Sequence, residues 1–134
     1  PFSMTYSGTA TVTTVNLKDV PKEATAAAEA WLEMVDGAKY AESWDAAGEM
    51  FQKGVTKDEW QRLAANARKP LGKFKSRKFK DACNVSTKPN GPADKDALLF
   101  QYEASYESRD KATETVTVIK GADGKWRVAG YFIR

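Results

Sequence analysis

The sequence predicts an α+β domain in which about three N-terminal helices pack on one face of an antiparallel β-sheet of four or more strands. Helical spacing of apolar residues is confined to residues 21–69, whereas β-branched and aromatic residues alternate with polar ones from residue 73 onward. Asp123-Gly124 lies between two such runs, which is a strong short-range signal for a β-hairpin. Helices followed by strands are typical of α+β domains, in which the helices cover the apolar face of the sheet.

Length and composition are those of one globular domain. With 134 residues, of which 42% are hydrophobic and 29% charged, the chain can bury a single core. Residues 1–20 are polar and rich in threonine, and they predict an N-terminal arm or edge strand before a single domain at residues 21–134. Residues 1–8 carry too little apolar surface to offset the entropy of ordering them. No apolar run is long enough for a transmembrane helix.

Composition also limits the chemistry. The net charge of +3 is too small by itself to imply a nucleic-acid partner. Histidine is absent, so the commonest general base and the commonest zinc ligand are both missing. Cys83 is the only cysteine, which excludes an intrachain disulfide. Asp94 and Asp96 offer too few ligands for calcium, so we expect no metal and no cofactor.

Three helices are expected, at residues 22–39, 40–47 and about 56–69. The third has the clearest signature, because Thr56 and Glu59 have the spacing of a capping box. Between the second and third helices, Gly48 and Gly54 bracket a compact turn. The side chains expected to face the core from this half of the chain are Ala24, Ala28, Trp31, Val35, Ala38, Tyr40, Trp44, Ala47, Met50, Phe51, Trp60, Leu63, Ala64 and Ala67.

Strands are expected at about residues 73–87 and 97–107, followed by the C-terminal hairpin. In that hairpin, Lys120 should lie opposite Trp126 and Val116 opposite Gly130. The inner sheet face would then consist of Leu98, Phe100, Tyr102, Ala104, Tyr106, Val116, Val118, Trp126, Val128 and Phe132. Ile119, Tyr131 and Ile133 would be on the outer face, beside Thr115, Thr117, Arg127 and Ala129, which makes that face a candidate homodimer surface.

Five short blocks carry a family resemblance: Trp44-Asp45, Arg68-Lys69-Pro70-Leu71-Gly72, Leu99-Phe100-Gln101-Tyr102, Glu114-Thr115-Val116-Thr117 and Asp123-Gly124-Lys125-Trp126-Arg127-Val128-Ala129-Gly130-Tyr131-Phe132-Ile133. Over roughly residues 24–133 the chain resembles an uncharacterised bacterial family, catalogued as domain of unknown function 4019. The resemblance implies a cone-like fold similar to the nuclear-transport-factor-2-like (cystatin-like) group, in which helices and a curved sheet enclose a pocket. Family members often carry a secretory or lipoprotein leader, which implies a periplasmic or envelope-associated location. No activity comes with the family.

Similar folds include ketosteroid-isomerase-like enzymes, whose catalytic residues follow a known pattern. Their chemistry needs a carboxylate base in an apolar pocket and an acid or phenol that stabilises an oxyanion. Asp45 is the candidate base, and Tyr40, Tyr102 or Tyr106 is the candidate donor. Because fold does not imply function and no nucleophile–base pair is recognisable, we expect no catalytic residue. The three tyrosines are instead expected at the rim of a ligand-binding pocket, with their hydroxyls in water.

Two charged groups allow either a structural or a binding role. The basic residues of the stretch 68–80 are Arg68, Lys69, Lys73, Lys75, Arg77, Lys78 and Lys80, with Phe74 and Phe79 among them. They would suit phosphates and stacked bases, but a solvated edge strand balanced by Glu103 and Glu107 explains them as well, so nucleic acid is not expected. The family resemblance implies that Glu114 and Arg68 or Arg77 act together, either as a structural ion pair, which we favour, or as a ligand clamp.

These observations predict a non-catalytic binding or interaction module of the bacterial cell envelope. Its partner would be a small ligand, an envelope protein or a second copy of the chain. The alternative is a small-molecule enzyme with a ketosteroid-isomerase-like pocket. A cone filled by bulky side chains favours the binding module, whereas a deep open pocket with a buried carboxylate facing a tyrosine hydroxyl favours the enzyme.

Overall fold

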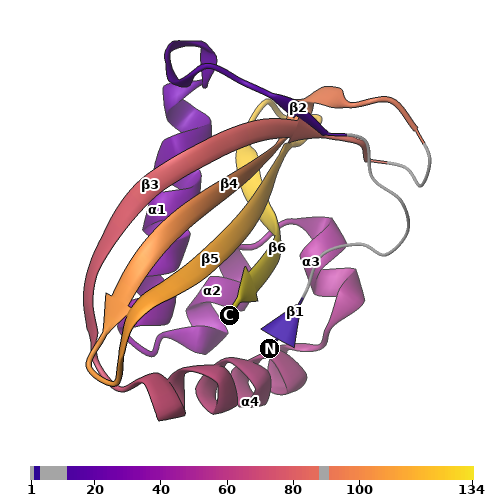
Figure 1. Cartoon of the computed structure of the whole chain (residues 1–134). Helices are drawn as coiled ribbons and strands as arrows, with labels where there is room; N and C mark the ends of the chain where they lie inside the picture. Colours follow the sequence, from indigo (N-terminus) through magenta and orange to yellow (C-terminus); the bar gives the residue numbers. More distant parts are fainter. Residues whose placement is uncertain (1, 4–11, 88–90) are drawn as a thin grey trace.

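The computed structural model describes residues 2–3, 12–87 and 91–134, and within them helices precede a curved sheet. The helices are η1 (Leu17–Asp19), α1 (Lys22–Asp36), α2 (Tyr40–Ala46), α3 (Glu49–Gly54), α4 (Lys57–Arg68) and η2 (Lys69–Leu71). The strands are β1 (Phe2–Ser3), β2 (Val12–Thr14), β3 (Phe74–Val85), β4 (Asp94–Tyr106), β5 (Arg109–Lys120) and β6 (Trp126–Ile133). The long strands curve around the α-helices (Figure 1). The predicted α+β fold class is confirmed.

All neighbouring strands of the sheet are antiparallel, in the order β1-β6-β5-β4-β3-β2. β2 pairs with β3 only at residues 83–85, so β3 from residue 74 to 82 has β4 as its one strand neighbour in the described chain. The predicted arm lies mostly outside the described residues, apart from Phe2–Ser3 paired with β6 and the short strand β2. The dispensability of residues 1–8 stays a prediction.

The predicted helices are present in the structure, with differences at individual positions. The capping box is confirmed, since the Glu59 amide donates to Thr56 Oγ1 over 3.2 Å and the Thr56 amide donates to Glu59 Oε1 over 3.0 Å. The expected turn after Gly48 is the short helix α3. Leu63 and Met50 were expected in the core but are 39% and 38% exposed, because α4 and α3 turn Trp60 and Phe51 inward instead. None of the described helices is both long and apolar enough to span a membrane.

A β-bulge changes the faces of the last strand. The register begins as predicted, with Lys120 opposite Trp126 and Val118 opposite Val128. Thr117 then pairs with Gly130, so Ala129 is an extra residue on β6 and Val116 lies opposite Tyr131 rather than Gly130. A one-residue shift exchanges the two faces of a strand. The predicted outward positions of Tyr131 and Ile133 are therefore wrong, since they are only 1% and 5% exposed.

Large side chains fill the space between helices and sheet. Trp31, Phe51, Trp60 and Tyr131 form an aromatic cluster with ring centroids 5.0–6.2 Å apart, and all four are at most 2% exposed. The Trp60 indole donates to Ser43 Oγ over 2.8 Å, and the Trp31 indole donates to the Ser43 carbonyl over 2.8 Å. Leu98, Phe100, Val116, Val118 and Val128 complete the apolar wall on the sheet side. The interior is a packed core, as the bulky residues predict.

Candidate functional site

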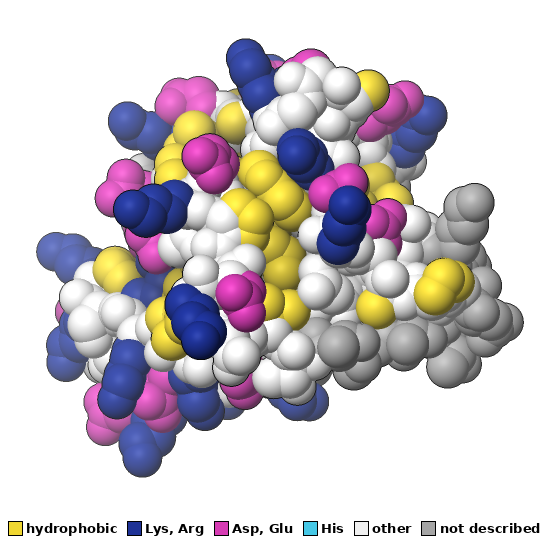
Figure 2. All heavy atoms as spheres, turned by 90° about the horizontal axis from the view of Figure 1, so that it is seen from above, with side chains coloured by type: hydrophobic (Ala, Val, Ile, Leu, Met, Phe, Trp, Pro, Cys, Tyr) yellow, Lys and Arg dark blue, Asp and Glu magenta, His cyan; other side chains and the backbone are white. Residues whose placement is uncertain are grey.

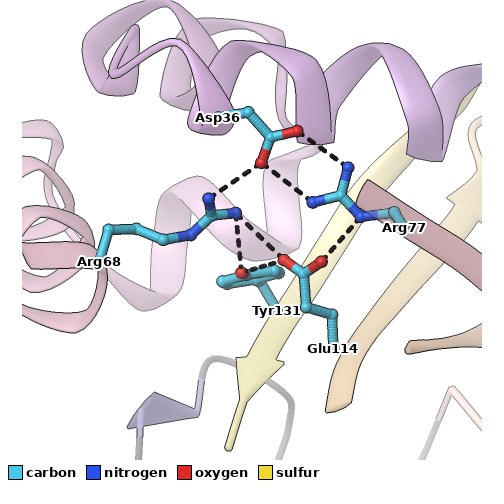
Figure 3. A network of polar contacts seen from close by, with 5 residues as sticks. All are labelled: Asp36, Arg68, Arg77, Glu114 and Tyr131. Atoms are coloured by element: carbon cyan, nitrogen blue, oxygen red, sulfur yellow. Dashed lines mark hydrogen bonds and ion pairs between the residues drawn. The ribbon is translucent and has the colours of Figure 1, made fainter. Parts of the chain in front are cut away.

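A buried network of charged side chains joins the two layers (Figure 3). Asp36 is the last residue of α1 and Arg68 the last residue of α4, while Arg77, Glu114 and Tyr131 project from β3, β5 and β6. The four charged side chains are between 0% and 12% exposed. Two arginines and two carboxylates give a formal net charge of zero. The network thus connects both long helices to three strands of the sheet.

Each carboxylate oxygen in the network has a donor. Arg77 forms a bidentate pair with Asp36, over 2.8 and 2.9 Å, and its Nε donates to Glu114 Oε1 over 2.7 Å. Arg68 donates to Asp36 Oδ1 over 2.9 Å, to Glu114 Oε2 over 3.1 Å and to Tyr131 Oη over 3.2 Å. The Tyr131 hydroxyl donates to Glu114 Oε2 over 2.5 Å. The predicted arginine–carboxylate pair is confirmed, and Glu114 binds both candidate arginines.

Electrostatics keep the two arginines and Tyr131 in their usual charge states. Burial lowers the pKa of Arg68 and Arg77, but the neighbouring carboxylates, and for Arg68 also Tyr131, outweigh burial and raise both values. Burial and then the Glu114 charge raise the pKa of Tyr131 well above 10, so this phenol remains a neutral donor. Aromatic rings add further contacts, since Arg77 lies 4.4 Å from the Phe74 ring centroid and Arg68 lies 5.0 Å from that of Tyr106.

This arrangement meets only half of the requirement for an isomerase-like site. A buried carboxylate, Glu114, does face a tyrosine hydroxyl, that of Tyr131. However, Glu114 is fully buried, and two guanidinium groups and the phenol already occupy both of its oxygens. A general base must reach a substrate proton at hydrogen-bond distance, and this carboxylate is 0% exposed with donors already bound to both of its oxygens. The geometry is that of a structural connection.

The carboxylate that the sequence offers as a candidate base, Asp45, lies on the surface. Asp45 forms an ion pair with Lys57 over 3.0 Å, and the two side chains are 56% and 42% exposed. This position contradicts a base in an apolar pocket. No group of three or more potential metal ligands occurs in the part of the chain that the structure describes.

The three tyrosines expected at a pocket rim lie in different environments. Tyr40 is partly exposed, but Tyr102 and Tyr106 are 1% and 0% exposed, so the expectation that their hydroxyls reach water is wrong. The Phe79 ring packs edge to face on Tyr102, and the Phe74 ring does so on Tyr106. Within the described chain, neither hydroxyl has a hydrogen-bond partner. Burial, and then the nearby Glu114 carboxylate, still raise the pKa of Tyr106. A ligand-binding role for these tyrosines stays a prediction.

Two surface grooves flank the network, and each contains one of these tyrosines. A groove of about 480 Å³ lies beside Tyr40, Arg68 and Lys73, and another of about 330 Å³ lies beside Tyr102, Arg77 and Glu33. Asp36 and Phe74 line both grooves. We call the two grooves together the rim. Hydrophobic side chains also gather across the end of the molecule seen in Figure 2, with acidic and basic side chains around them.

The basic stretch is divided between core and surface. Arg68 and Arg77 are committed to the network, and a bulge at Lys75 places Arg77 on the helix side of β3. The exposed members are Lys69, Lys73, Lys75, Lys78 and Lys80. Lys78 lies opposite Glu103 in the β3–β4 ladder, as the edge-strand interpretation expects. Without its two arginines this stretch is a weaker candidate for binding phosphates.

Sequence reasoning missed two members of the network. Tyr131 was expected on the outer face because the bulge at Ala129 leaves no clear signal in the pattern. Asp36 is not among the residues expected to face the core. An acidic residue in the last turn of a helix interacts unfavourably with the helix dipole, and this could have indicated that Asp36 has a cationic partner.

Comparison with known proteins gives one result. No curated protein matches the chain. The family model described as "Protein of unknown function (DUF4019)" matches residues 27–131, a span that contains all five network residues and both tyrosines of β4. The match covers most of the 134 residues, so this chain belongs to the DUF4019 family of proteins of unknown function.

Proposed function

We propose that this protein is a non-catalytic binding module of the bacterial cell envelope that recognises its ligand at the rim, the pair of grooves on either side of Asp36 and Phe74. The observation that carries the proposal is the closed network. Among the described residues, Glu114 is the one fully buried carboxylate, and both of its oxygens are occupied. With the interior packed, the recognition features that remain are on the surface.

Both grooves have the composition of a small-molecule site. Each combines an aromatic wall with charged side chains, and their volumes of about 330 and 480 Å³ are in the range of small ligands. The network fixes the position of Asp36, Arg68 and Arg77, so the walls are preorganised. Envelope location rests on the family resemblance, as does similarity to the nuclear-transport-factor-2-like fold group, which the order of helices and curved sheet supports. A homodimer through the outer sheet face stays a prediction, now without Tyr131 and Ile133.

Ligand screening by NMR tests where recognition occurs. With ¹⁵N-labelled protein and a mixture of small cationic, anionic and neutral compounds, we expect bound compounds to shift the amide signals of residues around Asp36, Phe74 and Tyr40. The indole N–H signals of Trp31 and Trp60 should not move, because both rings lie in the packed interior. These indoles serve as an internal control.

The enzyme alternative makes the opposite prediction. A ligand bound beside Glu114 and Tyr131 would have to enter the aromatic cluster and would shift the Trp31 and Trp60 indole signals. Such shifts, or turnover of a bound compound, would contradict recognition at the rim.

A further inference from the structure

The smaller groove of the rim lies between α1 and the edge strand β3, and its charges are mainly negative. Its volume is about 330 Å³. The side chains that line it are Glu29, Glu33, Asp36, Phe74, Ser76, Arg77, Phe79 and Tyr102. Three carboxylates and one guanidinium give these residues a formal charge of −2, although the whole chain carries +3. A cation attracted here would thus respond to local charge and not to the overall charge.

Two of the carboxylates are available to a ligand. Glu29, Glu33 and Asp36 follow one face of α1 at helical spacing. The two arginines neutralise Asp36. Glu29 and Glu33 are exposed and form no ion pair with any residue in the described part of the chain. Lys75, Lys78 and Lys80 are on the same strand as Arg77 but do not line the groove.

The aromatic wall suits a cation. The Phe79 and Tyr102 rings meet edge to face, with centroids 5.6 Å apart, and Phe74 already holds the Arg77 guanidinium at 4.4 Å. In the described chain no cation lies over Phe79 or Tyr102. An organic cation placed between these rings and the carboxylates would therefore gain both cation–π and ionic contacts.

An unpartnered hydroxyl is the second, independent indication of a ligand. Tyr102 lines the groove and is 1% exposed, yet its hydroxyl has no hydrogen-bond partner among the residues that the structure describes. Burial, and then the negative charge of Glu29, raise the pKa of this phenol, so at neutral pH it keeps its proton and both oxygen lone pairs. Buried polar groups normally have partners, and a ligand N–H would supply one.

We propose that the groove between α1 and β3 binds small organic cations that carry N–H donors, meaning alkyl ammonium or guanidinium groups. Glu29 and Glu33 neutralise the cation, the Phe79 and Tyr102 rings contact its apolar part, and Tyr102 Oη accepts an N–H hydrogen bond. The spacing of the two carboxylates, one helical turn apart, favours a diamine over a monoamine. This inference rests on the proposed recognition at the rim and assigns the class of ligand.

Titration with 1,4-diaminobutane, followed by NMR at constant ionic strength, tests the assignment. We expect saturable binding that shifts amide signals of α1 and β3 around the groove. The fully methylated diammonium compound has the same two charges and chain length but no N–H, and it should bind at least about tenfold more weakly. Tyr102→Phe should weaken diamine binding several-fold without lowering the urea midpoint of unfolding, because the hydroxyl that it removes has no partner in the described part of the chain.

Two double variants separate a local site from general electrostatics. Glu29→Gln/Glu33→Gln should raise the Kd at least about tenfold. Glu23→Gln/Glu42→Gln changes the net charge equally at exposed positions outside the groove and should change the Kd less than about twofold. Equal effects of the two pairs, equal binding of the methylated compound, or no saturable shift at millimolar diamine would overturn the cation assignment.

The same experiments test the broader proposal, recognition at the rim, separately from the cation assignment. An anionic or neutral compound that shifts rim signals, with the diamine inactive, would overturn the cation assignment and leave recognition at the rim standing. A compound that shifts the Trp31 and Trp60 indole signals would contradict both.

Discussion

Replacing Glu114 with Gln is expected to lower the free energy of unfolding by about 3–5 kcal/mol, which is the usual cost of removing one partner from a buried ion pair. The amide is nearly isosteric with the carboxylate but leaves Arg68 and Arg77 facing a single carboxylate, Asp36. One positive charge would then be uncompensated in a site where the side chains are at most 12% exposed. The loss is a large part of the free energy of unfolding of a small domain, which is typically about 5–15 kcal/mol.

Urea denaturation of the wild type and the variant measures this loss, with Asp45→Asn as the matched control. Asp45 also forms an ion pair, with Lys57, but both side chains are about half exposed. The control should change the free energy of unfolding by less than about 1 kcal/mol. A loss of less than about 1 kcal/mol in Glu114→Gln as well would contradict a structural role for the network.

Alkaline pH is expected to unfold the protein steeply, because three tyrosines are buried in their neutral form. Burial raises the pKa of Tyr102, and burial followed by the Glu114 charge raises the pKa of Tyr106 and Tyr131. In the unfolded chain the same phenols ionise near pH 10. Above about pH 10 the unfolded chain binds fewer protons than the folded one, so stability is fully present below that pH and is lost as the pH rises.

The slope of the free energy of unfolding against pH follows from the number of buried phenols. Each contributes about 1.4 kcal/mol per pH unit, so the free energy of unfolding should fall by about 4 kcal/mol per unit once all three ionise in the unfolded chain. Denaturation by urea at a series of pH values from 9 to 12 measures this slope. Tyr102→Phe removes one of the three groups and should reduce the slope by about a third. A slope near zero above pH 10 would contradict the burial of these phenols.

Most of the fold follows from local signals in the sequence. The capping box at Thr56 and Glu59 fixes the start of α4, and period-two alternation fixes the inner face of β4. The hairpin turn and the first pairs of its ladder follow from Asp123-Gly124 and the aromatic runs. These signals involve neighbours in sequence, so they can be read without knowledge of the rest of the chain.

The errors arise where one extra residue shifts a strand. The bulge at Ala129 turns Tyr131 inward, and the bulge at Lys75 places Arg77 beside the helices. A bulge depends on the partner strand and on the packing below it, so alternation in a single strand does not reveal it. The family resemblance was a better guide, since it correctly associated Glu114 with Arg68 or Arg77. The second carboxylate bound by these arginines, Asp36 on the distant helix α1, could be identified only from the tertiary structure.

Hydrogen exchange of the arginine Nε–H groups is the most direct test of a closed network between helices and sheet. NMR resolves these side-chain protons, and Arg62 and Arg109 provide exposed references in the same molecule. The Nε–H of Arg77 donates to Glu114, and Arg68 Nε is buried. Both should therefore exchange at least about a hundredfold more slowly than the references, since exchange requires the network to open. Exchange of Arg68 and Arg77 as fast as that of Arg62 and Arg109 would mean that water reaches the network and that the interior is open.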